Sequence, residues 1–74
     1  MELEVEQFKD NVSSFGRIRR QDNSIYYPDD MYRGKPVQRL VWETFVGPIP
    51  ADQLVDRIDD SEPYPHRLSN LQLV

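Results

Sequence analysis

Apolar residues recur at helical spacing in the middle of the chain. Five residues lie at positions i, i+3, i+4, i+7 and i+8 of this stretch: Val37, Leu40, Val41, Thr44 and Phe45. Such spacing places them on one face of a helix. Pro36 suits the first turn of that helix, and Gly47 followed by Pro48 prevents its continuation. The pattern predicts a central helix over about residues 36–46, with Arg39 and Glu43 one turn apart and able to pair.

The N-terminal half shows the alternation and the turn residues of short strands. Residues 1–6 alternate glutamate with apolar residues, which is the period of a half-exposed strand. Residues 15–20 and 25–27 predict a hairpin around the polar turn 21–24, and Asp10-Asn11 is a second natural turn. Residues 29–35 are expected to form a loop in which Gly34 adopts a positive φ.

After the helix, the pattern predicts a second hairpin. Residues 51–53 suit a turn, residues 54–58 a short strand, and residues 59–65 an acidic loop stiffened by two prolines. Residues 66–74 are apolar enough to pair back on that strand. The expected fold is a small single α+β domain over 1–74, with an N-terminal β-hairpin module (1–35) followed by the helix and a C-terminal hairpin (36–74).

The composition limits the classes of protein and site. Seventy-four residues make one small domain, which buries only about 60% of its unfolded surface. There is no cysteine, so disulfides and thiolate metal sites are excluded. No apolar run approaches the roughly 18 residues of a membrane span, and the acidic N-terminus is unlike a signal peptide. We expect a cytoplasmic protein without a membrane partner.

The charge balance bears on the partner. Nine basic and thirteen acidic side chains give a formal net charge of −4. Proteins that bind nucleic acid through phosphates are usually basic. The overall field therefore favours a basic protein surface as partner, or it serves only to keep a small domain soluble.

Four segments together resemble the HNH homing-endonuclease-like proteins of bacteriophages. The first is Val12-Ser13-Ser14-Phe15-Gly16-Arg17-Ile18-Arg19, similar to a module that precedes the nuclease unit. The others are residues 39–50, residues 55–59 and residues 67–71, in the order and near the spacing of the family. The resemblance implies a ββα-type hairpin in which an aspartate binds a metal ion and a histidine activates water.

This chain departs from the family at the positions of that chemistry. Asp56 keeps the aspartate position, but Arg57 stands where the family has its histidine base, and a guanidinium cannot accept a proton from water. Gln38 replaces another family histidine, and Asn70 matches the asparagine that braces the hairpin. The sequence ends at Val74, before the family's second metal ligand. We expect no catalytic residue, no metal and no cofactor.

The resemblance therefore implies a nuclease fold used for binding. The size and the degenerate motif are similar to those of small transcription regulators of lytic Xanthomonas phages, which bind the host RNA polymerase. This implies a non-enzymatic regulator, in the cytoplasm of the infected bacterium, that inhibits transcription initiation, with antitermination as a further effect. The alternatives are a residual DNA-binding or nicking protein and an acidic inhibitor of a host defence complex.

Several other residues are candidates for chemistry or binding, each with a plainer interpretation. His66 is expected to be a solvated loop histidine rather than a base, and the carboxylates of Asp56, Asp59, Asp60 and Glu62 a solvated turn rather than a cation site. The basic residues are either a remnant DNA-contacting face or ordinary surface charge: Arg17, Arg19, Arg20, Arg33, Lys35 and Arg39.

The candidate partner-binding residues combine charge with large aromatic side chains. They are Glu2, Glu4, Glu6, Arg17, Arg19, Arg20, Tyr26, Tyr27 and Trp42. Partly exposed aromatic residues make good interface anchors. The plainer interpretation, favoured for Tyr26 and Trp42, is that they wall a thin core.

Overall fold

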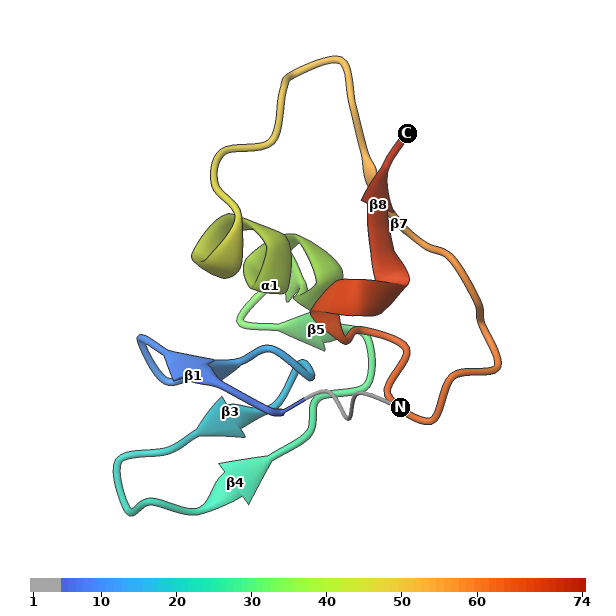
Figure 1. Ribbon diagram of the computed structural model, residues 1–74. Coiled ribbons are helices and arrows are strands. Elements are labelled where there is room, and N and C mark those ends of the chain that lie inside the picture. Colours follow the sequence, from blue (N-terminus) through green and yellow to red (C-terminus); the bar gives the residue numbers. More distant parts are fainter. Residues whose placement is uncertain (1–4) are drawn as a thin grey trace.

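The computed structural model describes residues 5–74 and shows an α+β domain with one α-helix and antiparallel strands (Figure 1). In chain order the elements are β1 (Phe8–Lys9), β2 (Val12–Ser13), β3 (Ile18–Arg19), β4 (Ile25–Tyr26), β5 (Met31–Tyr32), β6 (Lys35–Pro36), α1 (Val37–Phe45), β7 (Val55–Arg57), the 3₁₀ turn η1 (Leu68–Asn70) and β8 (Leu71–Leu73). Strands β1 to β4 form a four-stranded sheet in sequence order, while β5–β6 and β7–β8 are separate hairpins. The predicted α+β class with an N-terminal hairpin is confirmed.

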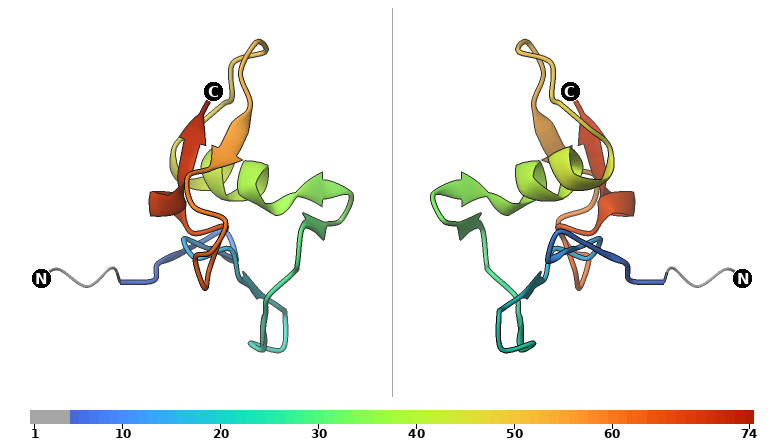
Figure 2. Two further views of the ribbon diagram at one scale, coloured as in Figure 1. Left: turned by 90° about the vertical axis from the view of Figure 1, so that its right-hand side faces the viewer. Right: turned by 90° about the vertical axis from the view of Figure 1, so that its left-hand side faces the viewer.

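Helix α1 lies between the four-stranded sheet and the β7–β8 hairpin, and the β5–β6 hairpin projects to one side (Figure 2). The core is small and almost entirely aliphatic. Its buried residues are Val12, Ile18, Val37, Val41, Val55 and Leu71, drawn from both strands and helix. Leu40, Trp42 and Phe45 pack against this cluster from the helix. The apolar face predicted for α1 is thus the face that joins the two halves of the chain.

Two hairpins form where the sequence pattern predicts none. Asp10 and Asn11 both have positive φ (52° and 67°), and they turn β1 into β2. Arg33 (φ 53°) and Gly34 (φ 78°) do the same between β5 and β6, so residues 31–36 form a hairpin rather than the predicted loop. Positive φ at both central residues is the geometry that suits two-residue hairpins. The positive φ predicted for Gly34 is confirmed.

The first strand predicted from alternation is not found in the described part of the chain. Residues 5–7 are not in a strand, and residues 1–4 lie outside the described residues. The predicted hairpin of residues 15–20 and 25–27 is present but shorter, since Ile18 and Arg19 pair with Tyr26 and Ile25. Phe15 lies in a turn and Tyr27 follows the strand.

The helix is one residue shorter at each end than predicted. Pro36 is its N-cap and Val46 its C-cap, and the backbone N–H groups of Val46 and Gly47 both donate to the carbonyl of Trp42. Glu43 pairs with Lys35 on β6 and not with Arg39, because the β5–β6 hairpin brings the lysine against the helix. Nine residues are too few to cross a membrane, and no helix within residues 5–74 could do so.

The C-terminal hairpin is confirmed. Val55 pairs with Leu73, Asp56 with Gln72 and Arg57 with Leu71. Because side chains alternate across a strand, Val55 and Leu71 face the core while Asp56 and Gln72 face solvent. Leu54 and Val74 extend the ladder by two backbone hydrogen bonds.

Candidate functional site

The positions that correspond to HNH chemistry lie on and beside the β7–β8 hairpin, where they make structural contacts. The side-chain amide of Gln38 donates to the carbonyl of Val55 (3.2 Å), tying α1 to β7. The guanidinium of Arg57 pairs with the carboxylate of Asp60 (3.1 Å). Each replacement is therefore engaged with a neighbour.

Asp56, which the resemblance aligns with a metal-ligand aspartate, faces solvent on β7. Its Oδ1 accepts the backbone N–H of Arg57 (2.9 Å). Asp59 accepts the N–H and the hydroxyl of Ser61 (2.9 and 2.7 Å), and these hydrogen bonds hold the pKa of its carboxyl below the usual value. No group of three His, Asp or Glu side chains among residues 5–74 is arranged to hold a metal ion.

Asn70 is buried and fastens the acidic loop 59–65 at both ends. Its Oδ1 accepts the N–H of Asp59 (3.0 Å), and its Nδ2 donates to the carbonyls of Asp59 and Pro65 (both 2.9 Å). The carbonyl of Asn70 also accepts the N–H of Ile58 (2.8 Å). This is the bracing contact that the resemblance implies for this position.

The interpretation of His66 as a solvated loop histidine is wrong. Its side chain is completely buried, and its Nε2 lies 2.5 Å from the carbonyl oxygen of Asp29. Since a carbonyl oxygen only accepts, Nε2 carries the proton. Tyr27 packs edge-on against the imidazole, with ring centroids 6.4 Å apart. The histidine thus holds the C-terminal loop against the segment after β4, and it is closed to any substrate.

The turn 13–17 docks on the loop 64–68, which the sequence did not indicate. The buried Ser13 hydroxyl accepts the N–H groups of Phe15 and Arg17 (both 3.0 Å) and so shapes the turn. The carbonyl of Ser14 then accepts the N–H of Leu68 (2.7 Å). Two of the segments that resemble the family are therefore in direct contact.

Gly16 sits at the closest point of this docking. It has a φ of +87°, and a Cβ placed on it would lie 2.8 Å from the Cβ of His66. Phe15 stacks on Tyr64 beside it (5.3 Å between centroids). Gly16, two residues after the Ser13-Ser14 pair, was the available signal in the sequence, but residue spacing alone does not reveal His66 as its partner.

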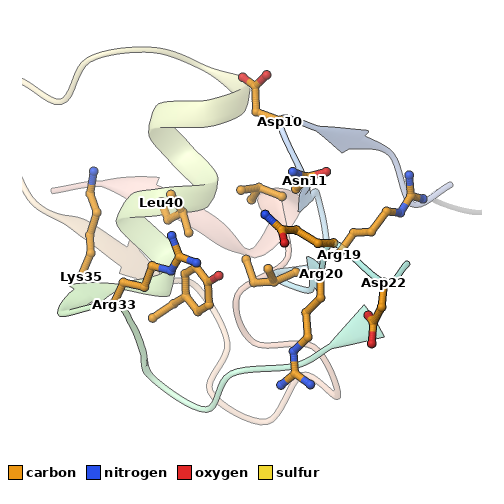
Figure 3. Close-up of a pocket in the computed structure, with 12 residues that line it drawn as sticks. Asp10, Asn11, Arg19, Arg20, Asp22, Arg33, Lys35 and Leu40 are labelled. Carbon is orange, nitrogen blue, oxygen red and sulfur yellow. The ribbon is translucent and has the colours of Figure 1, made fainter. Parts of the chain in front are cut away.

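Four of the six grouped basic residues line one groove of about 900 Å³, which we call the basic groove. Arg33 and Lys35 lie on one side of it, and Arg19 and Arg20 on the other (Figure 3). The remaining lining combines acidic, polar and apolar residues: Asp10, Asn11, Val12, Ile18, Gln21, Asp22, Tyr32 and Leu40. The hydrogen bonds of Ser24 to Asp22 lower the pKa of that carboxyl, so both signs of charge face the groove.

The three arginines of the basic groove lie over aromatic rings. The guanidinium of Arg19 is 4.3 Å from the centroid of Phe8, that of Arg20 is 4.5 Å from Tyr26, and that of Arg33 is 5.3 Å from Tyr32. Within residues 5–74 none of the three pairs with a carboxylate. Lys35 differs, because it pairs with Glu43.

The other charged candidates lie elsewhere. Arg17 makes a two-pronged contact with Glu6, and its hydrogen bonding lowers the pKa of the Glu6 carboxyl. Arg39 is exposed on α1 and is not part of the groove lining. Glu2 and Glu4 lie outside the described residues.

The aromatic candidates divide into structural and accessible ones. Trp42 is half-buried against the core, and Tyr27 packs on Tyr64 (5.6 Å) and His66, where burial raises the pKa of its phenol. Tyr26 is 37% exposed and stacks near Tyr32 at the edge of the basic groove. Of the three, Tyr26 is the exposed one; it is not part of the groove lining, but its ring lies under the guanidinium of Arg20, which lines the groove.

Comparisons of the chain with protein-family models, with curated proteins and with solved structures find no match.

Proposed function

We propose that this protein is a non-enzymatic phage regulator that binds the host bacterial RNA polymerase and inhibits transcription initiation, with antitermination as a further effect. Its site of action is the cytoplasm of the infected cell. The main support is what the residues at the HNH-like positions do in the fold. Gln38, Arg57 and Asn70 each contact a neighbouring segment. Asp56 faces solvent, and no group of three His, Asp or Glu side chains within residues 5–74 is arranged to hold a metal ion.

Two further features support binding rather than chemistry. The lone histidine is buried against Asp29, so it cannot serve as a general base for a bound substrate. The net charge of −4 favours approach to the basic nucleic-acid channels of a polymerase over approach to nucleic acid itself. The choice of RNA polymerase among protein partners comes from the resemblance to phage regulators.

A transcription assay tests the regulatory part. Purified bacterial RNA polymerase holoenzyme is mixed with the protein before or after open complexes form on a promoter template, and run-off RNA is measured. We expect less run-off RNA when the protein is added before open complexes form, and little change when it is added after they have formed. Equal RNA yields with and without the protein, in both orders of addition, would contradict the proposal.

A plasmid assay tests the absence of nuclease chemistry. Supercoiled plasmid is incubated with the protein and Mg²⁺ or Mn²⁺, beside an Asp56→Ala variant prepared in the same way. We expect neither protein to nick the plasmid above the background of buffer alone. Nicking by the wild type that disappears in Asp56→Ala would show that the residual nuclease alternative is correct.

A further inference from the structure

The basic groove differs from the rest of the charged surface in how its arginines are held. Arg17, Arg57 and Arg67 each pair with a carboxylate, and Arg67 also lies over the rings of Phe15 and Tyr64. Arg19, Arg20 and Arg33 lie over rings and have no carboxylate partner within residues 5–74. We propose that this groove is the docking site for an acidic, extended segment of the partner protein. The inference rests on the proposed function in that it takes the partner to be a protein.

Stacking on an aromatic ring orients a guanidinium so that it can bind a carboxylate. A ring under its face fixes the plane of the group, and the N–H donors at its edge remain available for a two-pronged contact. Less side-chain freedom is then lost when a carboxylate binds. Because Arg19, Arg20 and Arg33 have no carboxylate partner within residues 5–74, their donors are open to a ligand.

Arg33 lies in a turn position that is unfavourable for an arginine. It occupies the first central position of the β5–β6 turn with φ 53°, a conformation that glycine and asparagine adopt at lower cost. Glycine or asparagine at this position would form the turn with less backbone strain. The arginine instead projects from the hairpin tip over the groove and lies on Tyr32 (Figure 3).

The shape and the mixed charge of the groove favour an extended peptide. Arg19 and Arg20 extend away from each other, and Arg33 lies on the opposite side (Figure 3), so one compact anion cannot reach all three. Asp10 and Asp22 interrupt the positive lining. The partly buried side chains of Tyr32 and Leu40 add apolar surface to the lining, which suits a segment with apolar side chains between its carboxylates.

Nucleic acid fits the same lining less well. A phosphate backbone carries a charge at every step, so it would meet the carboxylates of Asp10 and Asp22 as well as the arginines. A peptide with a few carboxylates avoids most of this repulsion.

Fluorescence anisotropy tests the groove directly. The probes are a fluorescein-labelled peptide of repeated Glu-Glu-Leu, the same peptide with glutamine for glutamate, and labelled oligothymidylate of equal formal charge. The glutamate peptide is expected to bind most tightly. Arg20→Gln and Arg33→Gln should each weaken it about tenfold, the loss of one charge-assisted contact. Arg39→Gln, an exposed arginine outside the groove, is the matched control and should change the affinity by less than about twofold.

Urea unfolding of each variant shows that the fold is retained. The inference is wrong if the glutamate peptide binds no better than the glutamine peptide, or if Arg39→Gln weakens it as much as the groove variants. It is also wrong if oligothymidylate binds more tightly than the peptide and is released by the same substitutions, which would make nucleic acid the occupant.

Binding to RNA polymerase separates this inference from the proposed function. If the wild type binds the polymerase and the Arg20→Gln/Arg33→Gln double variant binds equally well, the groove is not the docking site and the proposed function stands. If the wild type binds the glutamate peptide through the groove but does not bind the polymerase, the groove chemistry stands and the proposed partner is wrong.

Discussion

At the scale of single residues, the contact between Gly16 and His66 holds the two halves of the chain together. The turn 13–17 can approach the loop 64–68 only because Gly16 has no side chain on the near face. The buried imidazole fills the space that results and bonds to Asp29. A residue that looked like a candidate base is therefore a structural one, and its role depends on a glycine fifty residues earlier.

Replacement of Gly16 by alanine should destabilise the protein for two reasons, backbone strain at a positive φ and a steric clash with His66. The positive φ disfavours any Cβ, and this Cβ would lie 2.8 Å from that of His66. We expect a loss of about 3 kcal/mol in the free energy of unfolding, measured by urea denaturation.

Gly34→Ala is the matched control for that experiment. Gly34 also has a positive φ (+78°), but nothing lies within 4 Å of a Cβ placed there. The Gly34→Ala variant should therefore lose only the free energy of unfolding that comes from backbone strain, about 1 kcal/mol. Equal losses in the free energy of unfolding for the two variants would show that the close approach to His66 does not affect stability.

The ion pair of Glu6 and Arg17 should make stability depend on pH. The hydrogen bond from Arg17 holds the pKa of Glu6 below its ordinary value of 4.5 in the folded protein. The pair therefore contributes stability above that value, and the contribution is lost as the pH falls through the folded pKa. At pH 7, Glu6→Gln should lower the free energy of unfolding by about 1 kcal/mol.

The difference in the free energy of unfolding between wild type and Glu6→Gln should shrink toward zero as the pH falls through the lowered folded pKa of Glu6, because both side chains are then neutral. Urea unfolding at a series of pH values measures it. Asp22→Asn is the comparison: hydrogen bonds from Ser24 also lower the pKa of its carboxyl, but in an exposed turn and without an ion pair within residues 5–74, so its pH-dependent difference should be smaller. A difference for Glu6→Gln that stays constant over this range would contradict the role given to the pair.

At the scale of elements, Asn70 organises the β7–β8 hairpin and the loop that precedes η1. One side chain bonds Asp59 twice and Pro65 once, so it closes a loop that has no strand or helix of its own. This loop carries Asp60, the partner of Arg57, and leads to His66. The loop that carries the partner of Arg57 and leads to His66 is thus closed by the side chain of Asn70.

Asn70→Ala should loosen this loop. Three hydrogen bonds of a buried amide are lost, and the carbonyls of Asp59 and Pro65 lose a donor. The expected loss of stability is about 2 kcal/mol, with faster hydrogen exchange at the backbone amides of residues 58–59. Gln72→Ala, on the exposed face of β8, should change neither quantity appreciably. Unchanged exchange in Asn70→Ala would mean that other contacts hold the loop.

The sequence predicted those elements whose signal is local. The helix followed from an apolar period with proline and glycine at its ends, and the C-terminal hairpin from two short apolar runs around a loop. The β1–β2 and β5–β6 hairpins were missed because strands of two residues have no measurable period. Their turns held the only signal, in Asp10-Asn11 and Arg33-Gly34.

The candidate site was predictable only in part, for a similar reason. The resemblance implied a bracing role for Asn70, and its hydrogen bonds to Asp59 and Pro65 agree with that role. The replacement of a base by Arg57 stays a prediction from the resemblance. The burial of His66 depends on a glycine and a carbonyl far away in the sequence, so its neighbours in the chain gave no indication. The basic groove likewise forms from strands that come together only after the chain folds.

At the scale of the whole molecule, the protein is a small α+β scaffold with charged surfaces. The helix joins the sheet to the β7–β8 hairpin, and the charged side chains divide into those that fasten the fold and those that line the basic groove. We propose as the central claim that a protein with this scaffold acts by binding RNA polymerase and not by cutting DNA.

Sedimentation of the fluorescently labelled protein with purified RNA polymerase holoenzyme, in the absence of DNA, tests that claim most directly. The account predicts that the label moves with the polymerase and stays with it at moderate salt, while labelled duplex DNA is not bound by the protein alone. A label that sediments as the free protein at every polymerase concentration, together with duplex binding that weakens steeply with salt, would contradict it.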